Sequence, residues 1–181
     1  MTLFFAALIT TFLLGSGGRD QVLIAALATK LGKRASLLAA GLVATVLASL
    51  AITWLAKWIG SGLGERAASG LVVLALLLAG MQMVWVQKSR IPAEPTRSLG
   101  AITLGFVILQ IADPVRLAIL GLVLISPDNA TAIGAALGAA LALTAGWLAK
   151  DRLPVELLLR LRKWLGMALI VLVGVGAITL V

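Results

Sequence analysis

Long apolar stretches separated by short polar connections fill almost the whole chain. We expect six helices, at residues 2–29, 36–59, 68–86, 99–125, 130–149 and 155–180. Each is long enough to cross a hydrocarbon layer of about 30 Å, which takes ~20 helical residues. None shows the dyad alternation over about ten residues that is typical of membrane barrel strands. The pattern therefore predicts an all-α membrane protein with six transmembrane helices.

The composition supports this class and removes several others. Hydrophobic residues make up 61% of the 181 residues, more than one soluble core of this size can bury. The chain has no cysteine and no histidine, which excludes thiolate nucleophiles, disulfides and imidazole proton relays, and leaves oxygen ligands for any metal. We expect no cofactor and no enzymatic activity, because no catalytic constellation is present.

The net charge of +8 has a topological meaning here. Eleven of the fifteen basic residues lie in or just after the first, third and fifth connections: Lys30, Lys33, Arg34, Lys88, Arg90, Arg97, Lys150, Arg152, Arg160, Arg162 and Lys163. The positive-inside rule then places these connections in the cytoplasm and both termini outside, as in a bacterial inner (plasma) membrane protein. We expect the lipid bilayer as the partner, and no nucleic acid.

The two halves of the chain resemble each other. The sequence Trp-Leu-Ala-Lys closes both the second helix, at residues 54–57, and the fifth, at 147–150. Three helices per half would give the halves opposite orientations, a plan typical of transporters. The predicted units are a first repeat at 1–88, a cytoplasmic linker at 89–98 and a second repeat at 99–181.

The first helix contains an unusual polar stretch at residues 15–21, Gly-Ser-Gly-Gly-Arg-Asp-Gln. Its glycines favour an unwound turn with accessible backbone groups. The candidate ligands for an ion are the backbone of Gly17 and Gly18 and the side chains of Asp20 and Gln21. A second interpretation is close helix packing, with Arg19 and Asp20 as a local charge pair.

The fourth helix contains the matching stretch at residues 110–116, Gln-Ile-Ala-Asp-Pro-Val-Arg. Pro114 has no amide hydrogen and should break the helix, freeing the carbonyl of Gln110 beside Asp113. A carboxylate, an amide and a free carbonyl suit a cation or a proton, so Asp113 is also the candidate metal ligand. Alternatively, Asp113 and Arg116 form an i,i+3 ion pair that cancels its own charge.

Small and polar residues also follow single helix faces. Thr45, Ser49 and Thr53 share one face, and Gly134 and Gly138 form a small-xxx-small pair. Such patterns usually indicate helix packing, while a hydroxyl line along a polar path is the alternative. Five tryptophans lie toward the span ends and are expected to be interface anchors: Trp54, Trp58, Trp85, Trp147 and Trp164.

On these stretches and this architecture the chain resembles the GDT1 family, also called UPF0016 or TMEM165-like. Members have two inverted three-helix repeats, each with a Glu-x-Gly-Asp-Lys/Arg-Ser/Thr motif, often followed by Gln, in its first helix. The first stretch keeps Gly17, Arg19 and Gln21 of that motif, and the second keeps Asp113. The resemblance implies a small exchanger that moves Mn²⁺ or Ca²⁺ against protons.

The acidic part of the motif is reduced in this chain. Gly15, Gly18 and Gln110 stand where the family has acidic residues, and Asp20 is displaced by two positions. With only Asp20 and Asp113 facing arginines, the predicted site is near neutrality and should bind a divalent cation weakly. The alternatives are a non-transporting scaffold or partner subunit and an exporter of another small solute; a homo-oligomer is left open.

Overall fold

The computed structural model describes residues 2–85, 98–111 and 113–179, and within them the chain is helical, without strands. The elements are α1 (Thr2–Gly15), α2 (Arg19–Leu31), α3 (Ala35–Gly62), α4 (Glu65–Val84), α5 (Leu99–Ile111), α6 (Pro114–Ile125), α7 (Asn129–Ala149), the 3-10 turn η1 (Lys150–Arg152) and α8 (Val155–Thr179). The predicted all-α class is confirmed. The predicted linker, apart from Ser98, lies outside the described residues, as do Lys88, Arg90 and Arg97.

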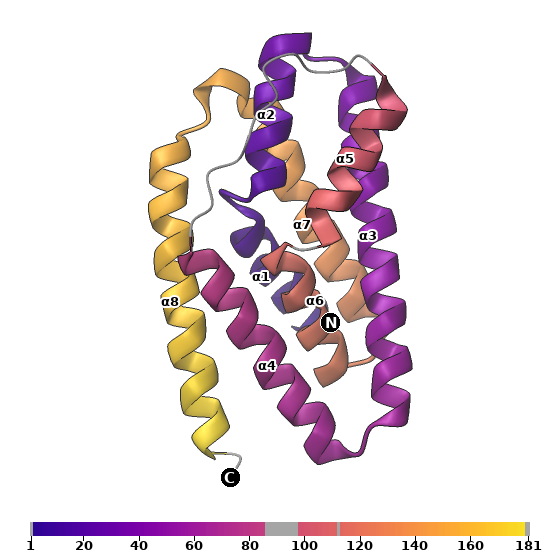
Figure 1. Cartoon of the computed structure of the whole chain (residues 1–181), viewed down its shortest axis with the longest axis vertical. Coiled ribbons are helices and arrows are strands. Elements are labelled where there is room, and N and C mark those ends of the chain that lie inside the picture. The colour runs from indigo at the N-terminus through magenta and orange to yellow at the C-terminus, as the bar shows by residue number, and fades with distance from the viewer. Residues whose placement is uncertain (1, 86–97, 112, 180–181) are drawn as a thin grey trace.

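The first and fourth predicted helices are each broken into two. The axes of α1 and α2 differ by 62°, and those of α5 and α6 by 60° (Figure 1). At the first break Gly17 has φ +75°, a conformation that side chains with a Cβ rarely adopt. At the second, Asp113 caps α6 by accepting a hydrogen bond from the Val115 amide, 2.9 Å away, with Pro114 following it.

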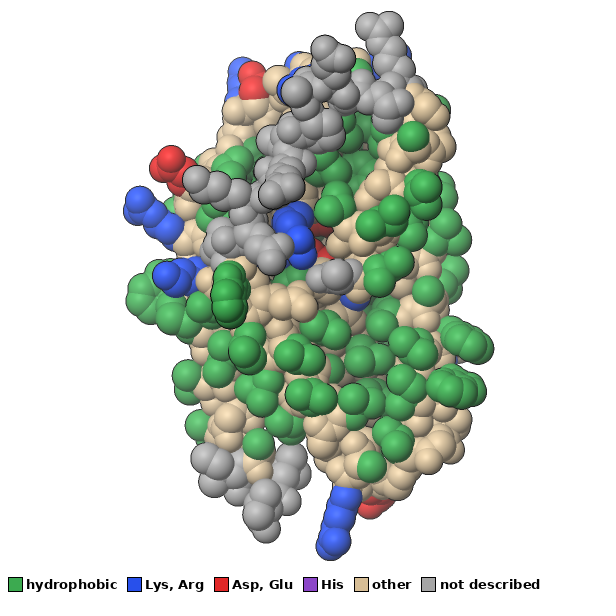
Figure 2. All heavy atoms as spheres, in the orientation of Figure 1, with side chains coloured by type: hydrophobic (Ala, Val, Ile, Leu, Met, Phe, Trp, Pro, Cys, Tyr) green, Lys and Arg blue, Asp and Glu red, His purple; other side chains and the backbone are tan. Residues whose placement is uncertain are grey.

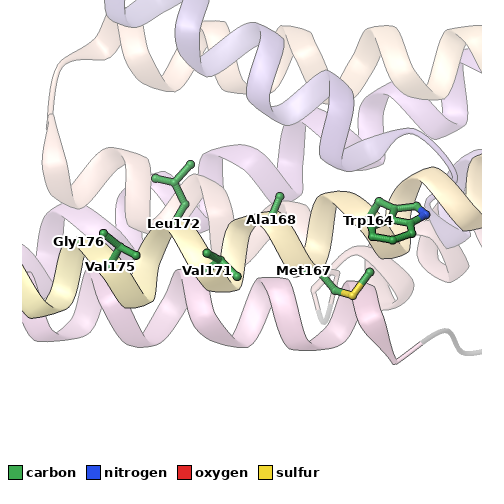
Figure 3. Close-up of a pocket in the computed structure, with 7 residues that line it drawn as sticks. All are labelled: Trp164, Met167, Ala168, Val171, Leu172, Val175 and Gly176. Atoms are coloured by element: carbon green, nitrogen blue, oxygen red, sulfur yellow. The ribbon is translucent and has the colours of Figure 1, made fainter.

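Several of these helices suit a membrane. In the described part of the chain, α3, α4 and α7 extended by η1 are long and apolar enough to span one, and five segments qualify if each bent pair is one span. Large apolar side chains are exposed along the long helices, and they cover much of the surface in Figure 2. On α8 they line an open apolar groove of about 700 Å³ (Figure 3). Such a surface would be a liability in water and suits a lipid environment.

The helices pack in a reciprocal pattern. The broken pair α1/α2 packs on α7, and the broken pair α5/α6 packs on α3, while α3 also contacts α7. In addition, α6 packs on α4. α4 and α8 lie side by side at one edge (Figure 1). The α1–α7 contact depends on Gly134 and Gly138, where an added Cβ would collide with the carbonyls of Phe4 and Leu8. The packing role predicted for these glycines is confirmed.

Two apolar cores form, one on each side of the helix breaks. The first includes Leu14, Ala56, Met83, Val115, Ile119 and Ala139. The second includes Ile24, Leu37, Phe106 and Leu143. Each broken helix pair therefore passes from one core to the other at its break, and α3 does so between Ala44 and Ala56. The level between the cores is where buried polar side chains collect.

The connections are sorted by charge. The α2–α3 and α7–α8 connections lie at one end of the bundle, and the α3–α4 and α6–α7 connections at the other (Figure 1). The first end carries Lys30, Lys33, Arg34, Lys150 and Arg152. There the Lys33 ammonium donates to the Leu148 carbonyl at 2.7 Å and lies over the Trp147 ring.

Candidate functional site

The level between the two cores contains a cluster of buried charges. Asp113, Arg116 and Arg162 are 2%, 3% and 6% exposed, and Asp20 is 9% exposed. Asp20 lies close enough to Asp113, Arg116 and Arg162 to interact with each electrostatically. The two helix breaks thus meet, and the two carboxylates predicted from separate halves of the chain share one site. Figure 2 shows acidic and basic atoms together in the middle of a largely apolar face.

At the first break, Gln21 holds the unwound turn in place. The Gly17 amide donates to Gln21 Oε1 at 2.6 Å, and Gln21 Nε2 donates to the Ala142 carbonyl of α7 at 2.9 Å. Both ends of this amide are therefore engaged by the protein. Asp20 Oδ1 accepts from the Gln21 amide at 2.8 Å, which aims the carboxylate along the start of α2. Arg19 is half-buried at the same turn.

At the second break, one oxygen of Asp113 is committed and the other is not. Oδ1 caps α6, whereas the buried Oδ2 accepts no hydrogen bond and lies 3.9 Å from Arg162 Nη2. The prediction that the Gln110 carbonyl is free is wrong, because the Asp113 amide donates a hydrogen bond to it at 3.2 Å. Pro114 removes the usual donor, and the tighter turn at the break supplies another.

Arg116 is fixed by neutral partners. Its Nη2 donates to Gln110 Oε1 at 2.6 Å and its Nη1 to Ser49 Oγ at 2.8 Å, while Nε is buried without a partner. Gln110 in turn donates to Thr45 Oγ1 at 3.0 Å. Two members of the predicted hydroxyl face on α3 therefore belong to the site, and Thr53 is half-buried farther along.

Asp113 and Arg116 do not form the direct i,i+3 salt bridge of the alternative interpretation, although their charges still interact electrostatically. That spacing brings side chains together only on a continuous helix, and Asp113 is a helix cap with ψ 139°. The carboxylate consequently faces α8, where Arg162 neutralises it.

Arg162 is a site residue that the sequence pattern did not identify. It was assigned to the basic cytoplasmic ends, yet it reaches the first break, where its Nη1 donates to the Leu14 carbonyl at 3.5 Å. Gly18 makes room for it, since an added Cβ would lie 3.0 Å from Arg162 Nη1 and 2.7 Å from Asp20 Oδ1. One sequence feature could have indicated its role: Arg162 lies two turns after the start of the last predicted helix, farther into the helix than a charge at a membrane boundary needs to be.

The site offers mixed chemistry. Its four buried ionisable groups, two carboxylates and two guanidinium groups, sum to zero formal charge. The described residues contain no group of three or more acidic, histidine or cysteine side chains that could hold a metal ion. The oxygen that remains available for an ion is Asp113 Oδ2, and the neighbouring Leu14 carbonyl accepts only the long hydrogen bond from Arg162.

The chain matches no protein-family model, no curated protein and no solved structure. Its function must therefore be inferred from its own residues and their geometry.

Proposed function

We propose that the protein is an integral membrane transporter of small ions, built on the GDT1-type plan of six spans in two inverted repeats. The observation that carries this is the meeting of two broken helices at a buried cluster of two carboxylates and two arginines. Half-helix ends that face each other near the middle of a bundle are a recurrent way to bind ions in transporters. The ion would bind at this cluster and pass between the two halves.

The cost of the cluster supports a functional role. A single charged residue at the centre of a helix in a bilayer costs about 2.5–3.5 kcal/mol on insertion scales. Buried pairs recover part of this, but apolar residues of similar size commonly serve stability as well or better. Four buried charges at one level are therefore expensive for a protein that only needs to fold. This argues against the scaffold alternative.

The reciprocal packing supports the repeat. If α1/α2, α3 and α4 correspond to α5/α6, α7 and α8, then exchanging the halves exchanges the α1–α7 contact with the α5–α3 contact. The same exchange turns α2–α7 into α6–α3 and leaves α3–α7 and α4–α8 unchanged. The α4–α6 contact is the exception, because α8 and α2 do not pack on each other to a similar extent. On this plan α8 is the sixth span, and the basic end of the bundle faces the cytoplasm with both termini outside.

The leading substrate class is a small cation, Mn²⁺ or Ca²⁺, exchanged for protons. In the described part of the chain, Asp113 Oδ2 is the buried carboxylate oxygen without a hydrogen bond, so it can accept either a proton or a metal ion. Asp20 is the second carboxylate within reach. Since these two acids are balanced by arginines, we expect binding to be weaker than in a site of four acids.

A small anionic solute is the second candidate. Arg116 has a buried Nε with no partner, and a guanidinium group with a free donor is suited to a carboxylate or phosphate group. Under this alternative Arg116, rather than Asp113, would be indispensable for transport.

The test is ion flux in liposomes that contain the purified protein and a Mn²⁺- or Ca²⁺-sensitive dye. The interior is set more acidic than the exterior, and Mn²⁺ or Ca²⁺ is then added outside. We expect uptake that is faster with the pH gradient than without it and is lost in Asp113→Asn, but is retained in Asp128→Asn, which removes an exposed acid at the start of α7. Absence of flux with folded wild-type protein would reject the cation proposal, and anion uptake that depends on Arg116 would support the alternative.

A further inference from the structure

The two buried arginines of the site are held very differently. Arg116 makes hydrogen bonds of 2.6 and 2.8 Å to Gln110 and Ser49. With the described residues, Arg162 makes only long polar contacts, 3.5 Å to the Leu14 carbonyl and 3.9 Å to Asp113 Oδ2. Good charge-assisted hydrogen bonds measure about 2.7–2.9 Å, so Arg162 neutralises its partner without a well-formed hydrogen bond to it. It is the more easily displaced of the two cations.

The groups around Arg162 are those that a free cation would seek. The Leu14 carbonyl belongs to the last turn of α1, the negative end of a helix dipole. Asp113 contributes a buried oxygen that makes no hydrogen bond, and the Asp20 carboxylate interacts with Arg162 electrostatically. The guanidinium group thus lies among oxygen atoms contributed by both helix breaks.

Arg162 lies on α8, a helix at the margin of the bundle. α8 packs mainly on α4, where Gly80 and Gly166 allow close approach. It meets the first break through Leu158, whose carbonyl would lie 2.9 Å from a Cβ at Gly17. A small displacement of α8 relative to this break would therefore withdraw the guanidinium group and leave the oxygens to another cation.

We propose that Arg162 is a tethered cation that competes with the transported cation for Asp113, an inference that rests on the proposed transport function. With Arg162 in place the four-residue cluster is neutral, and with Arg162 withdrawn it carries one negative charge. Arg162 therefore determines specificity and access: it keeps the carboxylate neutralised when no substrate is bound, and it sets how weakly a divalent ion binds.

The experiment measures Mn²⁺ binding to the purified full-length protein in detergent, by the loss of the free Mn²⁺ electron paramagnetic resonance signal. The variant is Arg162→Gln, and Arg162→Lys retains the charge at that position. Arg160→Gln is the matched control, because it removes the same charge from an exposed position on the same helix. The double variant Arg162→Gln/Asp113→Asn reports binding elsewhere, on surface carboxylates.

We expect Arg162→Gln to bind Mn²⁺ at least about tenfold more tightly than the wild type, since a unit charge this close in a partly buried site strongly opposes a second cation. Arg160→Gln and Arg162→Lys should stay near the wild type, and the double variant should lose the gain. Millimolar guanidinium ion should compete with Mn²⁺ in Arg162→Gln alone. Guanidinium ion can also be kept in the purification buffers, where it would neutralise Asp113 if the loss of Arg162 destabilises the variant.

Two results would overturn the proposal: an Arg162→Gln affinity equal to that of Arg160→Gln, or a gain that survives in the double variant. The binding assay is independent of flux, so the two proposals can fail separately. Tighter binding in Arg162→Gln without flux in the wild type would retain the tethered cation and reject transport. Flux in the wild type without tighter binding in Arg162→Gln would retain transport and reject the tethered cation.

Discussion

Gln110 provides the sharpest quantitative test of the buried network. It is fully buried, accepts from the Arg116 guanidinium group at 2.6 Å and donates to Thr45 Oγ1 at 3.0 Å. Hydrogen bonds between neutral side chains in membrane proteins average about 0.6 kcal/mol, whereas those to charged groups reach about 1.5–3 kcal/mol. The charged bond should therefore dominate the contribution of Gln110 to stability.

We expect Gln110→Ala to lower the free energy of unfolding by about 2–3 kcal/mol, because it leaves a buried guanidinium group short of one acceptor. Thr45→Val is the matched comparison, since it nearly preserves side-chain shape but removes the hydroxyl that Gln110 and the Gly41 carbonyl bind. Its cost should be roughly 0.6–1.5 kcal/mol. Unfolding of each variant can be followed by circular dichroism during titration of mixed micelles with dodecyl sulfate.

The relative cost of the two substitutions decides whether the network is correct. If Gln110→Ala costs no more than Thr45→Val, the Arg116 charge does not depend on Gln110, and the buried network described around α3 and α5 is wrong. A control at Ile108, which is exposed on the same helix, should leave the unfolding midpoint unchanged when it is replaced by alanine.

Two further predictions address packing and orientation. Gly138→Val should cost at least about 1–3 kcal/mol by overpacking the α1–α7 contact, and Gly105→Val, at an open position, should cost much less in the same unfolding assay. The native chain lacks cysteine, so single cysteines can report orientation: in intact cells an impermeant thiol reagent should label Gly64→Cys and spare Arg34→Cys, and the opposite pattern would invert the proposed topology.

Local sequence features were sufficient to predict much of the fold. The predicted helix at 36–59 corresponds to α3 (Ala35–Gly62), and the one at 130–149 to α7 (Asn129–Ala149). Both breaks were foreseen from chemistry that acts within one turn, namely the glycines of the first stretch and the proline of the second. The angles of the breaks were not predictable, because they depend on which helices each half-span packs against.

The site was less predictable because its contacts are long-range. Asp20, Gln21, Gln110 and Asp113 were identified as unusual polar residues in apolar helices, and the structure buries all four. Their partners come from elsewhere: Ser49 and Thr45 from α3, and Arg162 from the final helix. A local rule paired Asp113 with Arg116, and it failed because the helix break at Asp113 redirects the carboxylate.

The most direct test of the account is whether Mn²⁺ entry moves protons outward through this cluster. Liposomes with a pH-sensitive dye inside, prepared without a pH gradient, receive Mn²⁺ on the outside. We expect the interior to become more alkaline with wild-type protein and with Asp128→Asn, and to stay unchanged with Asp113→Asn. A rise in pH that is equally large in Asp113→Asn, or no rise with folded wild-type protein, would contradict it.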